Sequence, residues 1–120
     1  MNYKTIDMDS FPRRAHFEYF KGLAYPYVGF TVNVDITGFL AQQKRLGLPF
    51  YLALSYCVTR AANSVPEFRR RIHGDGIIEY DWCHGSHTVA LPDDTYCYCT
   101  LDCRMPFDEY LPCAAEAWER

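Results

Sequence analysis

Two different periods of apolar residues occur in the first half of the sequence, and they constrain the fold more than any other feature. In residues 28–34, valine and phenylalanine alternate with smaller or polar residues, a period of two that predicts a strand with one apolar face. In residues 50–63, apolar side chains such as Phe50, Leu54 and Val58 recur about every fourth position, which predicts an amphipathic helix. A chain with both periods packs helices against a sheet.

Three further helices are predicted from capping and stop signals. Their ranges are residues 13–20, capped by Asp9 or Ser10 and followed by Gly22; residues 38–46, capped by Asp35 or Thr37 and followed by Gly47; and a last helix from Pro106 or Phe107 through Trp118. The last helix is still running at Trp118, so we expect these residues to be part of a longer fold.

Four short strands are predicted in the second half of the chain. EFRRRI and IIEYD flank an Asp75-Gly76 turn, which is typical of a hairpin, and HTVAL and TYCYCTL are joined by the turn-forming PDD. The 120 residues suffice for one domain. We therefore predict an α+β fold of two layers, in which helices pack on a mixed sheet.

Composition excludes several classes of function. The net charge of −3 argues against a nucleic-acid partner. No run of apolar residues approaches the roughly 20 that a membrane span requires, and the first ten residues do not form a secretory signal. We expect a cytoplasmic protein whose six cysteines are free thiols rather than a disulfide framework.

The residue types that carry catalysis do not form a complete set. Cysteine and histidine gather in one region, and a zinc site or a Cys–His nucleophile pair there is an open alternative; these residues are Cys83, His84, His87, Cys97 and Cys99. Their spacing matches no standard zinc pattern, and no C-x-x-C occurs, so we predict no metal site. His16 and His73 are interpreted as surface or packed side chains.

Several blocks of the sequence resemble, in order and almost without gaps, the N-terminal half of the chloramphenicol acetyltransferase family. The blocks are RRAHFEYF, VNVDITGFL, FYLALSYCVTRAANSVPEFRRRIHGDGIIEYDW and HTV, and the resemblance runs from about Asp7 to Asp108. It implies an incomplete CoA-dependent acyltransferase fold in which residues 1–120 are the N-terminal half of a single domain. It also implies an O-acetyltransferase that uses acetyl-CoA as co-substrate and acetylates chloramphenicol or a similar hydroxylated small molecule. The family works as a homotrimer with its pocket at the subunit interface.

The family's general base is the histidine of an HHxxxDG motif, which this sequence does not contain. No histidine here inherits that role, so we assign no catalytic residue and expect these 120 residues alone to be inactive. The alternative is a non-catalytic module that binds a small molecule or serves in assembly.

The resemblance also implies which residues line the acceptor pocket and which one supports it. The implied lining residues are Tyr19, Phe20, Ala24, Pro26, Val28, Ser86, Thr88, Cys97 and Cys99. A shift of one residue at the PDDT turn would replace the two cysteines by Tyr96 and Tyr98, because only alternate residues of a strand share a face. Arg13 is the implied structural residue, the partner of the aspartate of HHxxxDG, and we expect it to be exposed or paired outside this sequence.

Overall fold

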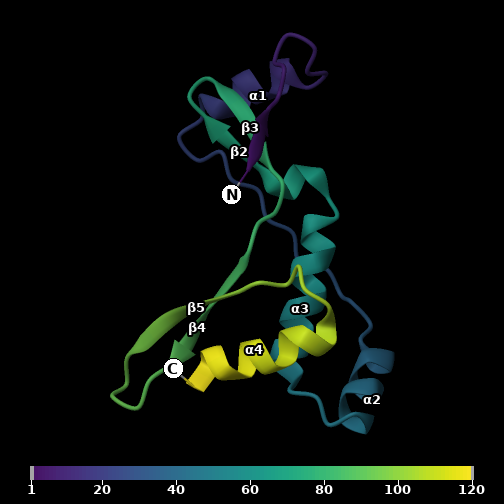
Figure 1. Ribbon diagram of the computed structural model, residues 1–120. Coiled ribbons are helices and arrows are strands. Elements are labelled where there is room, and N and C mark those ends of the chain that lie inside the picture. Colours follow the sequence, from purple (N-terminus) through teal and green to yellow (C-terminus); the bar gives the residue numbers. More distant parts are fainter. Residues whose placement is uncertain (1, 120) are drawn as a thin grey trace.

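The computed structural model describes residues 2–119, and Figure 1 shows an elongated α+β arrangement. The molecule measures 50 × 36 × 28 Å along its principal axes. The elements in chain order are β1 (Tyr3–Thr5), α1 (Arg14–Lys21), α2 (Thr37–Arg45), α3 (Phe50–Asn63), a 3-10 turn (Pro66–Arg69), β2 (Arg70–His73), β3 (Gly76–Tyr80), β4 (Gly85–Ala90), β5 (Tyr96–Leu101) and α4 (Phe107–Glu119).

The strands form two separate antiparallel sheets. One has the order β1-β3-β2, with Tyr3 opposite Tyr80 and Arg70 opposite Glu79. The other is the hairpin of β4 and β5, in which Thr88 lies opposite Tyr98. Figure 1 places the first sheet beside α1 at one end of the molecule and the hairpin toward the other end, with α3 running between them.

The main core lies where α3, α4 and β5 meet. Its fully buried members are Leu52, Cys99, Leu101, Cys103, Tyr110 and Ala114. Hydrogen bonds tie the elements together there: the Tyr110 hydroxyl donates to the Leu52 carbonyl at 2.9 Å, and the Tyr56 hydroxyl donates to the Met105 carbonyl at 2.9 Å. Burial and these bonds together fix α4 across α3.

A buried carboxylate holds the three-stranded sheet. Glu79 on β3 accepts a hydrogen bond from Arg70 on β2 at 2.9 Å, and it lies 3.4 Å from the ammonium of Lys4 on β1. Arg69 approaches within 3.8 Å of the same carboxylate. The hydrogen bond from Arg70 is the main reason that the pKa of Glu79 is lowered. One carboxylate therefore bridges all three strands.

The α+β class, the four predicted helices and both predicted hairpins are confirmed. The single mixed sheet is wrong, because all strand pairing among residues 2–119 is antiparallel and divided between two sheets. The predicted strand at residues 28–34 is also wrong: the segment is extended but pairs with no described strand. A strand needs a neighbour, and periodicity alone cannot supply one.

Smaller errors concern caps and turns. Ser10 donates to Asp7 and does not cap α1, whose first residue follows Arg13. The first hairpin turns at residues 74–75, one position before the prediction, because Gly74 adopts a φ of +59°. The short strand β1 was not predicted.

Candidate functional site

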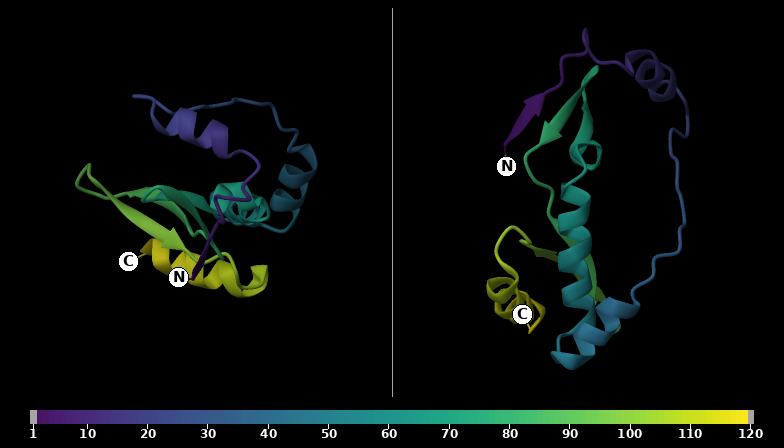
Figure 2. Two further views of the ribbon diagram at one scale, coloured as in Figure 1. Left: turned by 90° about the horizontal axis from the view of Figure 1, so that it is seen from above. Right: turned by 90° about the vertical axis from the view of Figure 1, so that its right-hand side faces the viewer.

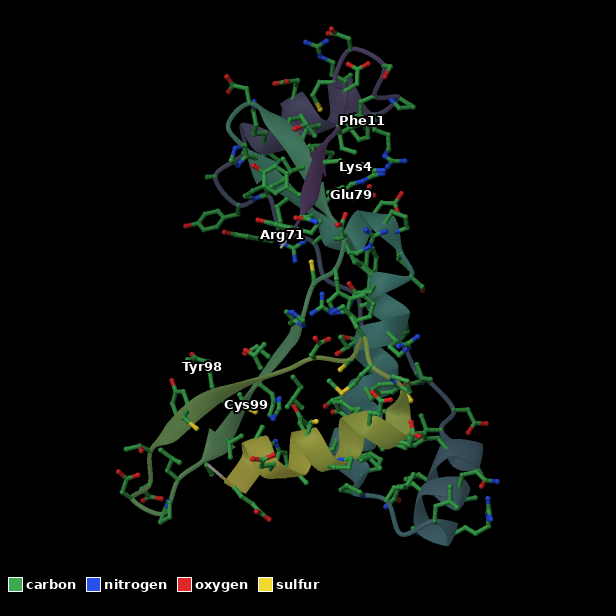
Figure 3. All side chains as sticks on the ribbon, viewed as in Figure 1. Lys4, Phe11, Arg71, Glu79, Tyr98 and Cys99 are labelled. Atoms are coloured by element: carbon green, nitrogen blue, oxygen red, sulfur yellow. The ribbon has the colours of Figure 1, made fainter. Side chains whose placement is uncertain are left out.

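The β4–β5 hairpin presents one polar and aromatic face outward and one apolar face to the helices. Residues directly opposite each other share a face, so Ser86 and Thr88 lie on the same side as Tyr98. Tyr98 is 73% exposed, whereas Cys99 is buried in the core. Figure 3 shows Tyr98 and Cys99 on opposite sides of β5, with Cys99 toward α4.

This register corrects one sequence prediction about the pocket. Cys97 lies opposite Val89 and Cys99 lies opposite His87, so both cysteines lie on the face away from Ser86 and Thr88. The four residues cannot line one surface of the hairpin. The alternative pair, Tyr96 and Tyr98, shares the outward face, and their rings contact edge to face at 5.8 Å between centroids.

The turn of this hairpin fixes that register. The Leu91 N–H donates to the Thr95 carbonyl at 2.9 Å, and the Asp93 carboxylate accepts from the Thr95 backbone N–H at 3.2 Å. Asp94 adopts a φ of +66°, which aspartate tolerates better than most residues. The residues between the strands thus determine which side chains of β5 face outward.

The residues predicted on and after α1 lie at the other end of the molecule, beside the three-stranded sheet (Figure 1). Tyr19 and Phe20 are exposed, and their rings meet edge to face at 5.2 Å. Phe20 and Pro26 line an open groove of about 450 Å³ together with Phe11, Phe17, Tyr27 and Ile77. The structure thus brings two predicted residues together in this groove.

The remaining predicted residues are solvent-exposed. Ala24 is exposed, and Val28 is 81% exposed on the segment between α1 and α2. Figures 1 and 2 show this segment and α1 away from the β4–β5 hairpin. Within this chain, the predicted lining therefore forms two separate surfaces rather than one pocket.

Arg13 lies immediately before α1, where its carbonyl accepts from the Phe17 N–H at 3.0 Å. Its side chain is 58% exposed, and its guanidinium lies 3.6 Å from the Glu67 carboxylate and 5.4 Å from the centre of the Phe11 ring. Of the two expected outcomes, exposure or a partner outside this sequence, the structure shows exposure, together with a pair to Glu67 within the chain. Such a surface ion pair contributes about 0–1 kcal/mol, so Glu67 leaves Arg13 free to exchange partners.

The cations that border the α1 groove contact carboxylates or backbone carbonyls of the same chain. Lys21 lies 3.4 Å from Glu18, and Arg70 is bound to Glu79. Arg71 donates to the backbone carbonyls of Phe68 and Arg70. Arg13, which also lines the groove, lies beside Glu67, so each of these four cations has a partner within the chain and none is assigned to a coenzyme phosphate.

The cysteines and histidines do not assemble into a metal site. Among residues 2–119, no group of three or more histidine, cysteine or acidic side chains is placed to hold a metal ion. The six cysteines are free thiols. Burial raises the pKa of Cys99 and of Cys103, which keeps both protonated and unreactive at neutral pH.

His87 is held by aromatic side chains rather than by an acid or a thiol. Its Nε2 accepts a hydrogen bond from the Trp118 indole at 2.7 Å, and its ring contacts Tyr51 at 5.1 Å. Because Nε2 accepts this hydrogen bond, it carries no hydrogen, and the single N–H of a neutral His87 ring is on Nδ1. This contact joins β4 to α4 and α3, so we interpret it as structural.

Sequence reasoning missed two features of this arrangement. The resemblance implies Tyr98 only as the alternative to the cysteines of β5, because which residues of β5 face outward depends on the number of residues in the PDDT turn. Glu79 was not considered, although a two-residue turn at Gly74-Asp75 places it opposite Arg70. A register count from that turn would have found the ion pair.

Comparisons with known proteins agree on one family. The family model described as "Chloramphenicol acetyltransferase" matches residues 1–115. Chloramphenicol acetyltransferase 2 of Escherichia coli is 30% identical over 104 residues, covering 87% of this chain and 48% of that protein. A chloramphenicol acetyltransferase of Clostridium perfringens is 32% identical over 114 residues, covering 92% of this chain and 53% of that protein.

A solved structure of a chloramphenicol acetyltransferase superimposes with a TM-score of 0.87 at 27% identity, covering 98% of this chain and 56% of that one. The chain therefore spans about half the length of the proteins it matches. Within residues 2–119, no helix is both long enough and apolar enough to cross a membrane.

Proposed function

The chain belongs to the chloramphenicol acetyltransferase family, and from that premise we propose that it forms the acceptor-binding half of an acetyl-CoA-dependent O-acetyltransferase. The observation that carries this proposal is the match along almost the entire chain to about half of a transferase fold. We propose chloramphenicol or a similar hydroxylated small molecule as the acceptor. The assembled enzyme is proposed to be a homotrimer with its pocket at the subunit interface.

The residues of this chain act on the acceptor side of the proposed reaction. Ser86 and Thr88 offer hydroxyl groups that bind polar groups of the acceptor, and Tyr98 beside them offers a ring that packs against it. Tyr19 and Phe20 supply a second aromatic surface. Binding and orientation by Ser86, Thr88 and Tyr98 hold the acceptor hydroxyl in place.

The general base is proposed to come from the part of the fold that lies outside these residues, since the 120-residue sequence contains no HHxxxDG. Acetyl-CoA supplies the acetyl group as an activated thioester, and no described residue is assigned to it. Arg13 is proposed to exchange Glu67 for the aspartate of that motif. General-base catalysis typically contributes about 10²–10⁴-fold, so the chain alone is expected to be inactive.

The test is acetyl transfer to chloramphenicol by the chain alone and by the chain co-expressed with the unmatched half of Escherichia coli chloramphenicol acetyltransferase 2. Product should be measured by mass spectrometry, because thiol reagents that detect released CoA would also react with the six free cysteines. An analogue with fluorine in place of the primary hydroxyl is the matched control.

We expect acetylated chloramphenicol only when both halves are present, and none from the fluorinated analogue. Absence of transfer from the combined halves, after assembly has been verified by mass, would contradict the proposal. If chloramphenicol nevertheless bound the chain alone with micromolar affinity, the result would favour a non-catalytic binding module.

A further inference from the structure

The segment between α1 and α2 crosses much of the length of the molecule without a neighbouring strand (Figure 2). In the part of the chain that the structure describes, no backbone–backbone hydrogen bond joins residues 24–35 to another segment. Its far end is nevertheless fixed, because Asp35 accepts a hydrogen bond from the backbone N–H of Thr37 at 2.9 Å. The segment is anchored at a helix and extended, with its backbone donors and acceptors unpaired within the chain.

Its side chains have the pattern of a strand that is covered on one face. Val28, Phe30, Val32 and Val34 alternate with smaller or polar residues, and they are 81%, 87%, 75% and 72% exposed. Residues 22–34 carry no charge. An uncharged, period-two segment with free backbone groups is the kind of edge that pairs with another strand.

The exposed area of the whole chain calls for a large partner. The accessible surface is 9249 Å², whereas a compact monomer of 14.0 kDa exposes roughly 6,700 Å². The radius of gyration is 18.1 Å, compared with about 14 Å for a compact domain of this length. This chain thus exposes about 2,500 Å² more than a compact monomer would. That area is larger than the area a standard interface buries on each partner, and it is in the range of an obligate interface.

A second copy of the chain does not meet these requirements. Two copies of the segment could pair antiparallel in two registers. In one register the apolar residues of both copies would lie on the same side of a two-stranded ribbon. In the other register each side would carry apolar residues from one copy and polar residues from the other. The apolar face would stay uncovered in both arrangements, and an isolated pair of strands is marginally stable. The occupant must supply both a neighbouring strand and an apolar layer.

We propose that residues 27–35 are a docking strand that becomes part of a sheet only when a complementing polypeptide adds to it. This chain covers 56% of the solved chloramphenicol acetyltransferase, so a little under half of that fold has no counterpart here. The occupant is a polypeptide equivalent to that remaining part, either continuous with this chain or separate. It contributes a strand beside residues 27–35 and apolar side chains over the face formed by Val28, Phe30, Val32 and Val34.

This inference rests on the proposed function for the identity of the partner, but its test does not depend on acetyl transfer. Amide hydrogen exchange of residues 27–35 is measured by mass spectrometry in the 120-residue chain alone and after mixing with a probe. The probes are the unmatched halves of the Escherichia coli and Clostridium perfringens relatives, each used separately. Sedimentation records the oligomeric state in every sample.

The variant Phe30→Lys places a charge on the apolar face, and Asn33→Lys places the same charge on the opposite face as the matched control. We expect residues 27–35 to exchange freely in the chain alone and to become protected with either probe. Phe30→Lys should weaken the complex by about 100-fold or more, because the ammonium would be buried without a partner, whereas Asn33→Lys should retain binding and protection.

Other outcomes would overturn the inference. Protection in the monomeric chain would mean that the segment is covered from within, and protection in a homo-oligomer would identify a second copy as the occupant. Free exchange in the presence of both probes would exclude a complementing half as the partner. Equal loss of binding in the two lysine variants would show that the apolar face is not what the partner covers. If acetyl transfer failed while protection was still observed, the docking strand would stand and the proposed activity would not.

Discussion

Replacing Tyr110 by phenylalanine tests the main core with the smallest possible change. Its side chain is 1% exposed, and its hydroxyl donates to the Leu52 carbonyl at 2.9 Å, which fixes α4 on α3. The Leu52 carbonyl also accepts the helical N–H of Tyr56, so it is not left unpaired in the variant. We therefore expect a loss of only about 1 kcal/mol in the free energy of unfolding.

The measurement is urea unfolding followed by circular dichroism. A loss of this size lowers the midpoint by about 0.5–1 M, given a slope of about 1–2 kcal/mol per molar urea for a chain of this size. Tyr110→Ala, which also removes the ring packed 4.8 Å from Tyr56, should cost about 3–5 kcal/mol. The exposed Tyr98→Phe is the matched control and should change stability by less than about 0.5 kcal/mol.

The pH dependence of this difference gives a second test of the same contact. Burial raises the pKa of Tyr110, so the folded state keeps the phenol neutral after the unfolded chain has begun to ionise at about pH 10. The stabilisation that the neutral Tyr110 phenol gives the folded state is therefore present below that pH and is lost as the pH rises further. The stability difference between wild type and Tyr110→Phe should stay constant from pH 6 to 9 and shrink above 10. A Tyr110→Phe variant as stable as wild type at pH 7 would refute the reasoning.

Three other substitutions follow from the contacts described above. Glu79→Gln should cost about 2 kcal/mol at pH 7 by removing the carboxylate partner of Arg70. Because the pKa of Glu79 is lowered, its contribution is fully present above about pH 4.5 and decreases as the pH falls through the lowered pKa, so the difference in urea unfolding between wild type and Glu79→Gln should shrink steadily below pH 4.5. Gly85→Ala would place a Cβ 2.6 Å from the Thr59 hydroxyl oxygen and should lower the free energy of unfolding by about 1–2 kcal/mol. In the same urea assay, the double variant Gly85→Ala/Thr59→Ala should recover most of this loss. Gly38 lies on α2, and a Cβ added there would meet no atom within 4 Å. Gly38→Ala should therefore raise the free energy of unfolding by about 0.5–1 kcal/mol and raise the thermal midpoint. A lower midpoint would contradict the placement of Gly38 in an open helical position.

Local signals were sufficient wherever an element is stabilised by its own sequence or by a neighbour close along the chain. The period of residues 50–63 predicted α3 with its observed bounds, and Gly47, with a φ of +64°, follows α2 as expected. The hairpins were predicted because their strands are separated by a few turn residues. In each case, the information that determines the structure lies within a short window.

The features that were not predicted depend on distant partners or on exact spacing. Residues 28–34 have a strand pattern but no partner among the described residues, so pattern and structure disagree there. The three residues of β1 are too few to show a period, and they are defined by pairing with β3 far along the chain. The outward face of β5 changes with one residue in the turn, so a gapless match to the family selects Cys97 and Cys99 instead of Tyr96 and Tyr98.

The acceptor KM of two hairpin variants tests most directly whether this chain binds the acceptor through the outward face of β4–β5. In the chain co-expressed with its complementing half, Tyr98→Ala and Cys97→Ala change adjacent residues on opposite faces of β5. We predict that Tyr98→Ala raises the KM for chloramphenicol about 10-fold, the loss of about 1.4 kcal/mol of aromatic contact, and leaves the KM for acetyl-CoA unchanged. Cys97→Ala should change neither value. A rise in the chloramphenicol KM from Cys97→Ala, with none from Tyr98→Ala, would contradict the assignment of this face.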